Sequence, residues 1–282
     1  MKRGDGPAGL EKPRPGFPAK LVTHPAVVVK KTALPQPSRP VVLPPVKSPA
    51  LGAAGVAKPA PSRVASGFGT GSQAVRADMV RKLQVQGITH PGVLAAMLAV
   101  ERHRFVDTAL ANQAYEDTSL PIGLGQTISK PNVVARMLSL LFERDGVNLG
   151  RVLEIGTGCG YQAALLSHLS REVYSIERLR GLHEKARENL RTFRLANLHL
   201  LFGDGMQGFA KGAPYSGILA AAGGEAIPQA WIDQLAVGGR LVAPAVTAAG
   251  QQRLVVIDKT VRGLDRKELE PVLFVPLKSG IA

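Results

Sequence analysis

Three glycines at alternate positions, Gly156, Gly158 and Gly160, interrupt an apolar stretch of the chain. Such a turn lets a ligand approach the backbone closely. Its spacing differs from the Gly-x-Gly-x-x-Gly of dinucleotide enzymes. Two acids accompany it: Glu154 precedes the turn, and Glu177 follows about 20 residues later, where α/β folds place the carboxylate that holds ribose hydroxyls. These residues favour a nucleoside ligand. A sulfonium cofactor, which has no phosphate, suits two nearby carboxylates better than a dinucleotide does.

A second set of candidate residues surrounds Ser129. A loop with several Gly and Pro residues precedes this serine, and Pro131 suits the first turn of an expected helix. Ser129 is suited either to cap that helix or to turn its hydroxyl group to a ligand. Because the loop precedes the first expected strand, it would overhang the ligand crevice of an α/β sheet. Asp204, between two glycines at a strand end, is suited equally to a turn or to a contact with adenine or ribose.

Alternating strands and helices would position these residues. Their periodicity predicts an α/β fold with a doubly wound, mostly parallel sheet of about seven strands, preceded by N-terminal helices near 72–86 and from Pro91. Four or five strands are expected to be parallel, and the last pair to form an antiparallel hairpin. The first of these expected strands begins at Arg151. The other six cover residues 172–177, 197–202, 215–221, 238–244, 252–257 and 271–276.

The first 70 residues differ from the rest in composition. They hold 13 of the 21 prolines and a net charge of +9, whereas the remaining 212 residues carry +5. Such a segment cannot build a core, and we expect residues 1–70 to be a disordered leader and residues 71–282 to be the catalytic domain. A solvated tail and an electrostatic arm for nucleic acid both fit the leader. Nucleic acid would be bound only through this segment.

Cys159 is the single cysteine, which excludes an internal disulfide and a cysteine-based zinc site and fits a reducing compartment. We therefore expect no metal. No apolar run approaches the roughly 20 residues of a membrane span, and prolines and lysines interrupt the N-terminal segment where a secretory signal would need a continuous apolar region. A cytoplasmic location and a monomer are the default expectations.

Taken together, these stretches resemble the protein-L-isoaspartate O-methyltransferases from about Ser72 to Leu277. Two departures are Leu124, where bacterial members often have His or another polar residue, and Cys159, where a small residue such as Ser is common. The long basic leader is also atypical. The resemblance rests on Ala114-Tyr-Glu-Asp117, Leu120-Pro-Ile-Gly123, Gly125-Gln-Thr-Ile-Ser129, Val152-Leu-Glu-Ile-Gly-Thr-Gly158, Gly203-Asp-Gly205, Gly238-Gly-Arg-Leu-Val242 and Gln252-Arg-Leu254.

The resemblance implies a Rossmann-like methyltransferase fold and a protein-repair activity. A methyl group would pass from S-adenosylmethionine to the free α-carboxylate of L-isoaspartyl residues in damaged proteins and peptides, which return through a succinimide to aspartate. Ser129 would be the active-site serine, and Thr127 and Ile128 would contact cofactor or substrate. The cofactor site would be formed by Glu154, Gly156, Gly158, Glu177, Asp204 and Gly205.

Three other functions fit parts of the sequence. One is an S-adenosylmethionine-dependent methyltransferase of a small molecule or of RNA. Another is a nucleic-acid-binding protein on a methyltransferase fold that has lost its activity, which the complete set of Glu154, Glu177 and Asp204 disfavours. The third is an NAD enzyme, which the glycine spacing disfavours. A serine hydrolase is also disfavoured, because Ser129 lacks a Gly-x-Ser-x-Gly turn and a paired His.

Overall fold

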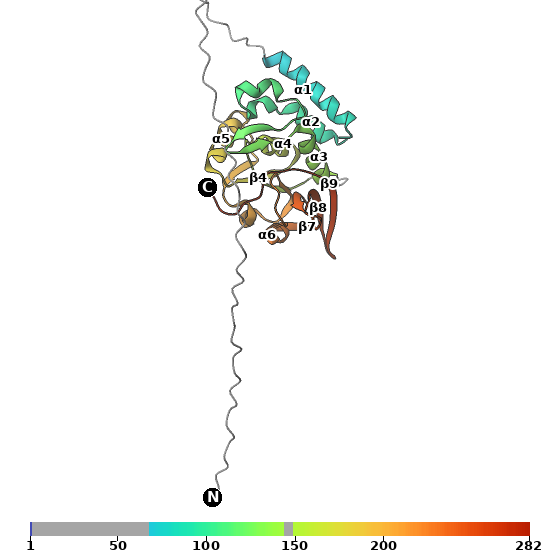
Figure 1. The fold of residues 1–282 in the computed structure, drawn as a ribbon, viewed down its shortest axis with the longest axis vertical. Coiled ribbons are helices and arrows are strands. Elements are labelled where there is room, and N and C mark those ends of the chain that lie inside the picture. Colours follow the sequence, from blue (N-terminus) through green and yellow to red (C-terminus); the bar gives the residue numbers. More distant parts are fainter. Residues whose placement is uncertain (2–67, 144–148) are drawn as a thin grey trace, which may run out of the picture. The chain divides into compact units, whose positions relative to one another are not determined.

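The computed structural model describes residue 1, residues 68–143 and residues 149–282 (Figure 1). The predicted disordered leader therefore lies almost wholly outside the described residues, and the boundary at residue 70 stays a prediction. The first helix, α1, spans Phe68–Val85 and is followed by α2 over Pro91–Ala99. Proline opens α2 as expected, and the His90 side chain accepts a hydrogen bond from the backbone N–H of Val93.

The centre of the fold is a seven-stranded sheet in the order β5-β4-β3-β6-β7-β8-β9. The first five strands of this order are parallel, and β8 and β9 are antiparallel to their neighbours. The doubly wound, mostly parallel sheet is thus confirmed. Its strands are β3 (Arg151–Ile155), β4 (Glu172–Glu177), β5 (Leu198–Phe202), β6 (Tyr215–Ala220), β7 (Leu235–Val246), β8 (Gln252–Thr260) and β9 (Gly263–Pro271).

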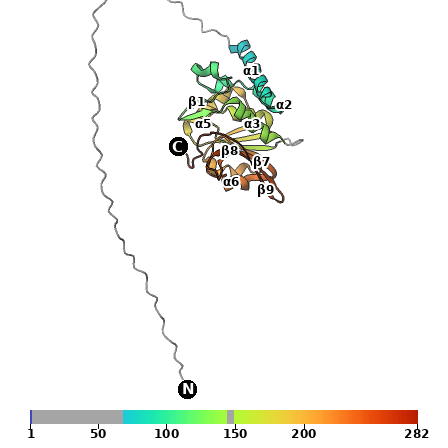
Figure 2. The same ribbon diagram turned by 45° about the vertical axis from the view of Figure 1, so that its right-hand side comes forward.

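Helices cover both faces of the sheet. In both ribbon views α1 and α2 lie on one side and α6 lies on the other (Figures 1 and 2). Two buried clusters correspond to the two faces: the neighbours Val152 and Leu153 belong to different clusters, because successive side chains of a strand point to opposite faces. The remaining helices are α3 (Pro131–Phe142), α4 (Tyr161–Leu169), α5 (Arg180–Leu190) and α6 (Gln229–Gln234), with short 3-10 turns at η1 (Arg102–Phe105), η2 (Thr108–Gln113), η3 (Arg191–Phe193), η4 (Gly205–Gln207) and η5 (Ala210–Gly212).

The segment before α3 is a small hairpin, where the sequence indicated only a loop. Strands β1 (Leu120–Gly123) and β2 (Gln126–Ile128) pair antiparallel, with Gly123 opposite Gln126. The two residues between them, Leu124 and Gly125, have φ angles of 51° and 69°. Positive φ at both central residues is what a tight hairpin turn needs. The hairpin carries Thr127 and Ile128 and leads directly to Ser129.

The last strand was predicted wrongly. The expected strand at residues 271–276 is not formed, and β8 pairs instead with β9, Gly263–Pro271. This strand is largely exposed and strongly charged, which suits the edge of a sheet because charged side chains discourage pairing with another chain. The apolar run that follows reaches the end of β6 instead: Gly223 N–H donates to the Val275 carbonyl, and Leu277 N–H donates to the Gly223 carbonyl, both at 2.9 Å.

Within the described residues, no helix combines the length and the apolar character that a membrane crossing requires.

Candidate active site

A cleft lies at the carboxyl ends of β3, β4 and β6, beside the β1–β2 hairpin. Its space, with the open mouth included, is about 880 Å³. The order of strands reverses between β3 and β6, and α/β sheets bind ligands at such a switch point. The lining includes most of the residues expected at the site: Thr127, Ile128, Ser129, Gly156, Gly158, Glu177 and Gly205. Glu154 and Asp204 are not part of it.

The glycine turn between β3 and α4 forms the floor of this cleft. Gly156, Gly158 and Gly160 have φ angles of 91°, 56° and 92°, which side chains rarely allow. The backbone N–H of Gly156 donates to the Ile176 carbonyl at 2.9 Å, so the turn is held against the end of β4. A Cβ atom at Gly160 would come within 2.7 Å of Leu190 Cδ1. The glycines are therefore needed for the turn's conformation and for the close packing of α4 on α5.

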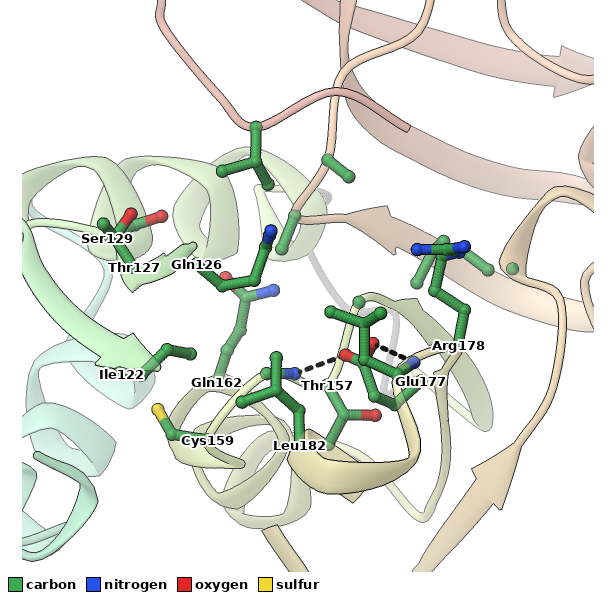
Figure 3. A pocket seen from close by; sticks show the side chains of 18 of the residues that line it. Ile122, Gln126, Thr127, Ser129, Thr157, Cys159, Gln162, Glu177, Arg178 and Leu182 are labelled. Carbon is green, nitrogen blue, oxygen red and sulfur yellow. Dashed lines mark hydrogen bonds between the residues drawn. The ribbon is translucent and has the colours of Figure 1, made fainter. Parts of the chain in front are cut away.

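Glu177 ends β4 and closes one side of the cleft. Its side chain is 5% exposed. Oε2 accepts a hydrogen bond from Gly158 N–H, and Oε1 accepts one from Leu179 N–H, both at 2.9 Å (Figure 3). A carboxylate has about four acceptor positions, so each oxygen keeps capacity for a further donor. The geometry thus permits the expected contact with ribose hydroxyls.

Glu154 lies beneath the glycine turn and is fully buried. The Ser175 hydroxyl donates to its Oε2, and Ser175 Oγ is also 2.6 Å from Thr157 Oγ1 in the turn. Its Oε1 is buried without a hydrogen-bond partner among the described residues. Burial raises the pKa of this carboxyl to about 8. Glu154 therefore supports the turn from below, and its assignment to the cofactor site stays a prediction.

Asp204 stabilises two backbone segments at the rim of the cleft. Its Oδ1 accepts a hydrogen bond from Met206 N–H at the start of η4, and Oδ2 accepts one from Gly280 N–H, both at 2.8 Å. The sequence left two roles open for Asp204, a turn or a contact with adenine or ribose. In this structure its hydrogen bonds are those of a turn. Its neighbour Gly205 does line the cleft, and a Cβ atom there would come within 2.7 Å of Ile155 Cγ2.

Ser129 is not the cap of α3. The N-cap of this helix is Lys130. The backbone N–H of Asn132, in the first turn, donates to Asp117 Oδ1 at 2.9 Å. Within the described part of the chain the Ser129 hydroxyl makes no hydrogen bond to protein, whereas its carbonyl accepts one from Arg102 Nη2 at 2.8 Å. Ser129 lies on the side of the cleft opposite Glu177 (Figure 3). Its hydroxyl is thus available to a ligand.

A second groove lies on the other side of Ser129. Its walls come from the start of α3, with Lys130 and Arg136, and from the end of β9 and the segment after it, with Glu270 and Phe274. Arg136 Nε and Glu270 Oε1 form an ion pair at 2.9 Å across this groove. In the part of the chain that the structure describes, Ser129 alone lines both this groove and the cleft. The pair of cavities, joined at a free hydroxyl, can hold a donor molecule and an acceptor molecule side by side.

Several residues at the cleft were not singled out from the sequence. Ala221 and Ala222 follow β6, so the rule that ligands bind at the carboxyl ends of parallel strands could have found them. Residues 275–278 gave no usable signal, because their apolar character suggested a strand. Gln126 and Gln162 both contribute amide groups to the lining (Figure 3). Among the described residues there is no cluster of His, Cys, Asp and Glu that could hold a metal ion.

Comparison with known proteins identifies relatives of the whole domain. A model of the family described as protein-L-isoaspartate(D-aspartate) O-methyltransferase matches residues 74–282. Protein-L-isoaspartate O-methyltransferases of Methylibium petroleiphilum and Leptothrix cholodnii are 62% and 59% identical to this chain over 218 and 220 residues. The matches cover 76% and 77% of this chain, and 81% and 78% of those relatives.

Solved structures show the same fold. One protein-L-isoaspartate O-methyltransferase has a TM-score of 0.66 and 26% identity, over 73% of this chain and 67% of that one. A putative protein-L-isoaspartate O-methyltransferase of Plasmodium falciparum, in complex with S-adenosyl-L-homocysteine, has a TM-score of 0.64 and 24% identity, over 72% and 98% of the two chains.

The sequence relatives, the family match and the site agree, and they do not favour a methyltransferase of small molecules or RNA. The match over residues 74–282 contains the glycine turn, the hairpin and both cavities. The chain therefore belongs to the protein-L-isoaspartate(D-aspartate) O-methyltransferase family, whose members are S-adenosylmethionine-dependent enzymes of protein repair.

Proposed function

We propose that Ser129 orients the free α-carboxylate of an L-isoaspartyl residue for methyl transfer, with the cofactor in the cleft and the substrate peptide in the groove. The reaction is the one of the family, which returns isoaspartyl residues through a methyl ester and a succinimide to aspartate. The observation that carries the proposal is that Ser129 lines both cavities and that its hydroxyl has no hydrogen-bond partner among residues 68–143 and 149–282. A transfer between two molecules needs such a residue where their sites meet.

The residues of the cleft fit S-adenosylmethionine. The turn of Gly156 and Gly158 lets a ligand lie against the backbone, and Glu177 has acceptor capacity for ribose hydroxyls. Glu154 would contribute to the cofactor site from beneath the turn, through the hydrogen bonds of Ser175 to Glu154 and to Thr157. Thr127 and Ile128 would contact the cofactor from the hairpin, and Asp204 and Gly205 would do so at the rim. The similar Plasmodium protein is in complex with S-adenosyl-L-homocysteine, which supports a cofactor of this kind.

Bound S-adenosylmethionine supplies the methyl group, and its sulfur keeps the electron pair of the broken bond. The protein does not need a strong base, because a carboxylate acceptor is ionised near neutrality. What the chain contributes is alignment of the acceptor oxygen with the methyl group and exclusion of water from that oxygen. The neutral Ser129 hydroxyl can donate a hydrogen bond to the carboxylate without cancelling its charge. A Lys or Arg on the same oxygen would lower its nucleophilicity.

We infer the remaining features of the protein from its composition. A cytoplasmic location fits the single cysteine, a monomer is the simplest assembly, and nucleic acid would be bound only through the basic leader.

The test combines paired peptides with a serine variant. Two peptides that differ only in Asp or isoaspartate are incubated with radiolabelled S-adenosylmethionine, and we expect label on the isoaspartyl peptide alone. Ser129→Ala should lower turnover by about 10- to 1,000-fold, the scale for losing one pre-organised donor, with cofactor affinity nearly unchanged. Ser167→Ala in α4 is the matched control and should keep the wild-type rate, because Ser167 lines neither cavity and its hydroxyl donates to the Ala164 carbonyl. A wild-type rate for Ser129→Ala, or equal labelling of both peptides, would contradict the proposal.

A further inference from the structure

A fully buried arginine lies behind the proposed active-site serine. Arg102, the first residue of η1, is 0% exposed. Among the described residues it has no acidic partner within ion-pair distance, and its Nη1 has no hydrogen-bond partner. Its planar group lies 4.9 Å from the centre of the Tyr161 ring, and Tyr161 lines the cleft. Burying a guanidinium group without a carboxylate is costly, so the fold keeps it here at a cost in stability.

The two hydrogen bonds of Arg102 go to backbone carbonyls at the two ends of one segment. Nε donates to the Ala114 carbonyl at 2.7 Å, and Nη2 donates to the Ser129 carbonyl at 2.8 Å. The segment between them contains the β1–β2 hairpin and ends at the serine. Because the donors of a guanidinium group have a fixed planar geometry, one side chain sets the separation of the two ends. Charged donors also make these hydrogen bonds stronger than neutral ones.

The same contact fixes the backbone at the reacting residue. The Ser129 side chain has no hydrogen bond of its own to the described protein, so the protein positions this hydroxyl group through the backbone that carries it. That backbone is held on one side by β2 and on the other by Pro131 at the start of α3. Arg102 supplies a side-chain hydrogen bond to the carbonyl between these two supports. Packing alone would not require a cation here, because an apolar side chain such as Met fills a buried site without the desolvation cost.

We propose that Arg102 is a positioning residue for methyl transfer: it holds the Ser129 carbonyl from behind the hairpin and thereby fixes the place from which the Ser129 hydroxyl reaches the acceptor carboxylate. This inference rests on the proposed role of Ser129. Arg102 touches neither the cofactor nor the substrate, so it acts only through the serine. Its loss should therefore affect turnover of the isoaspartyl peptide much more than binding of the cofactor.

The test is a double-mutant cycle in the full chain, with kcat, KM and cofactor affinity measured for each variant. We expect Arg102→Gln to lower kcat on an isoaspartyl peptide by about 10- to 100-fold, the scale of a small misplacement of a catalytic group. In the Ser129→Ala background the same substitution should cost less than about 3-fold, since the group that it positions is already absent. Cofactor affinity should stay within about 2-fold of wild type.

Two further variants keep the test decisive. Arg104→Gln is the matched control: Arg104 is in the same 3-10 turn, bonds Thr192 Oγ1 on the surface, and should leave kcat unchanged. Arg102→Lys keeps the charge but has a single donor nitrogen where Arg102 uses Nε and Nη2. It should therefore fold and show a smaller loss of kcat that also disappears in the Ser129→Ala background. If Arg102→Gln has no cooperative melting transition and therefore does not fold, Arg102→Lys is the variant on which the inference is judged.

The outcomes separate the two proposals. If the Arg102 substitutions multiply the Ser129→Ala loss by their full factor, Arg102 is merely structural and the inference is overturned. If Ser129→Ala alone keeps the wild-type rate, the proposed role of Ser129 fails, and the inference fails with it. If Ser129→Ala and Arg102→Gln are each slow and the Arg102 substitutions add little in the Ser129→Ala background, both proposals are supported. A wild-type kcat for Arg102→Gln alone overturns the inference about Arg102.

Discussion

Glu154 and Glu177 have the same side chain in different surroundings. Both oxygens of Glu177 accept backbone N–H groups, one of them from the glycine turn. Glu154 has one oxygen bound by Ser175 and the other without a partner among the described residues. The sequence assigns both acids to one cofactor site. In the structure Glu177 shapes the wall of the cleft, whereas Glu154 supports its floor.

The raised pKa of Glu154 makes stability depend on pH. The carboxyl group has an ordinary pKa of 4.5 and a folded-state pKa of about 8. Below pH 4.5 it is protonated in both states. Between pH 4.5 and 8 the unfolded chain releases the proton and the folded protein retains it, so the free energy of unfolding falls as pH rises, by at most about 1.4 kcal/mol per pH unit. Glu154→Gln cannot ionise, so its melting temperature minus that of the wild type should increase from pH 5 to pH 8.

The control for that measurement is Asp78→Asn in α1. The hydrogen-bonded Lys82 ammonium, with Nζ 2.8 Å from Oδ2, holds the pKa of Asp78 below its usual value. Stability from this group is therefore lost only as pH falls below about 4, and the difference between Asp78→Asn and wild type should be flat above pH 5. Parallel curves for Glu154→Gln and wild type would show that Glu154 does not keep its proton in the folded state.

At single positions the sequence identified residue types better than their contacts. Gly156, Gly158, Glu177 and Ser129 were found because spacing alone marks a turn, a strand end or a loop beside a helix. The burial of Glu154 was not predictable, since it depends on which face of β3 lies under α4. Arg102 was missed for a related reason: it stands in a run of charged residues, Glu101-Arg-His-Arg104, which is typical of a solvated surface.

Among the elements, the parallel strands could be predicted from their apolar runs, whereas the hairpin beside the site could not. Strands β1 and β2 have only four and three residues, too few to show an alternating pattern. Strand β9 was missed because its charged residues do not resemble a strand, and the apolar run after it does. β9 is an edge strand and needs backbone partners on one side only, so it can be charged and exposed. The apolar run after β9 packs beside the cleft and does not form a strand.

The turn of the β1–β2 hairpin contains a strained residue. Leu124 has φ 51° and a side chain that is 62% exposed. The left-handed conformation costs roughly 1–2 kcal/mol for a residue such as Leu and less for Asn, whose side chain can hydrogen-bond locally. We expect Leu124→Asn to stabilise the protein by about 1 kcal/mol and to raise the melting temperature by about 2–4 °C.

Leu98→Asn provides the comparison for Leu124. Leu98 is also exposed, at 41%, but it lies in α2, where its backbone is helical. The same substitution there should not raise the melting temperature, because no left-handed conformation is relieved and Asn is a poorer helix former than Leu. An equal gain at both positions would attribute the effect to the removal of an exposed leucine rather than to the backbone.

At the scale of the whole molecule, the leader and the domain differ in what they can bury. The composition of residues 1–70 cannot supply a core, whereas Met79 and Leu83 of α1 are buried in the domain. We expect a chain that begins at Ala65, and therefore retains all of α1, to keep its melting temperature within about 1 °C and to methylate short isoaspartyl peptides at the wild-type rate. A chain that begins at Gln86 is the control and should lose stability. A clear fall in melting temperature for the longer chain would show that the leader packs on the domain.

The meeting of the cleft and the groove at a single residue has a kinetic consequence. Because Ser129 is the only described residue that belongs to both linings, neither substrate needs to pass through the other's cavity, and neither cavity has to be filled before the other can accept its ligand. Turnover should then follow a sequential scheme with a ternary complex and no compulsory order of addition. No modified form of the enzyme would persist between half-reactions, and each product could depart while the other remains bound.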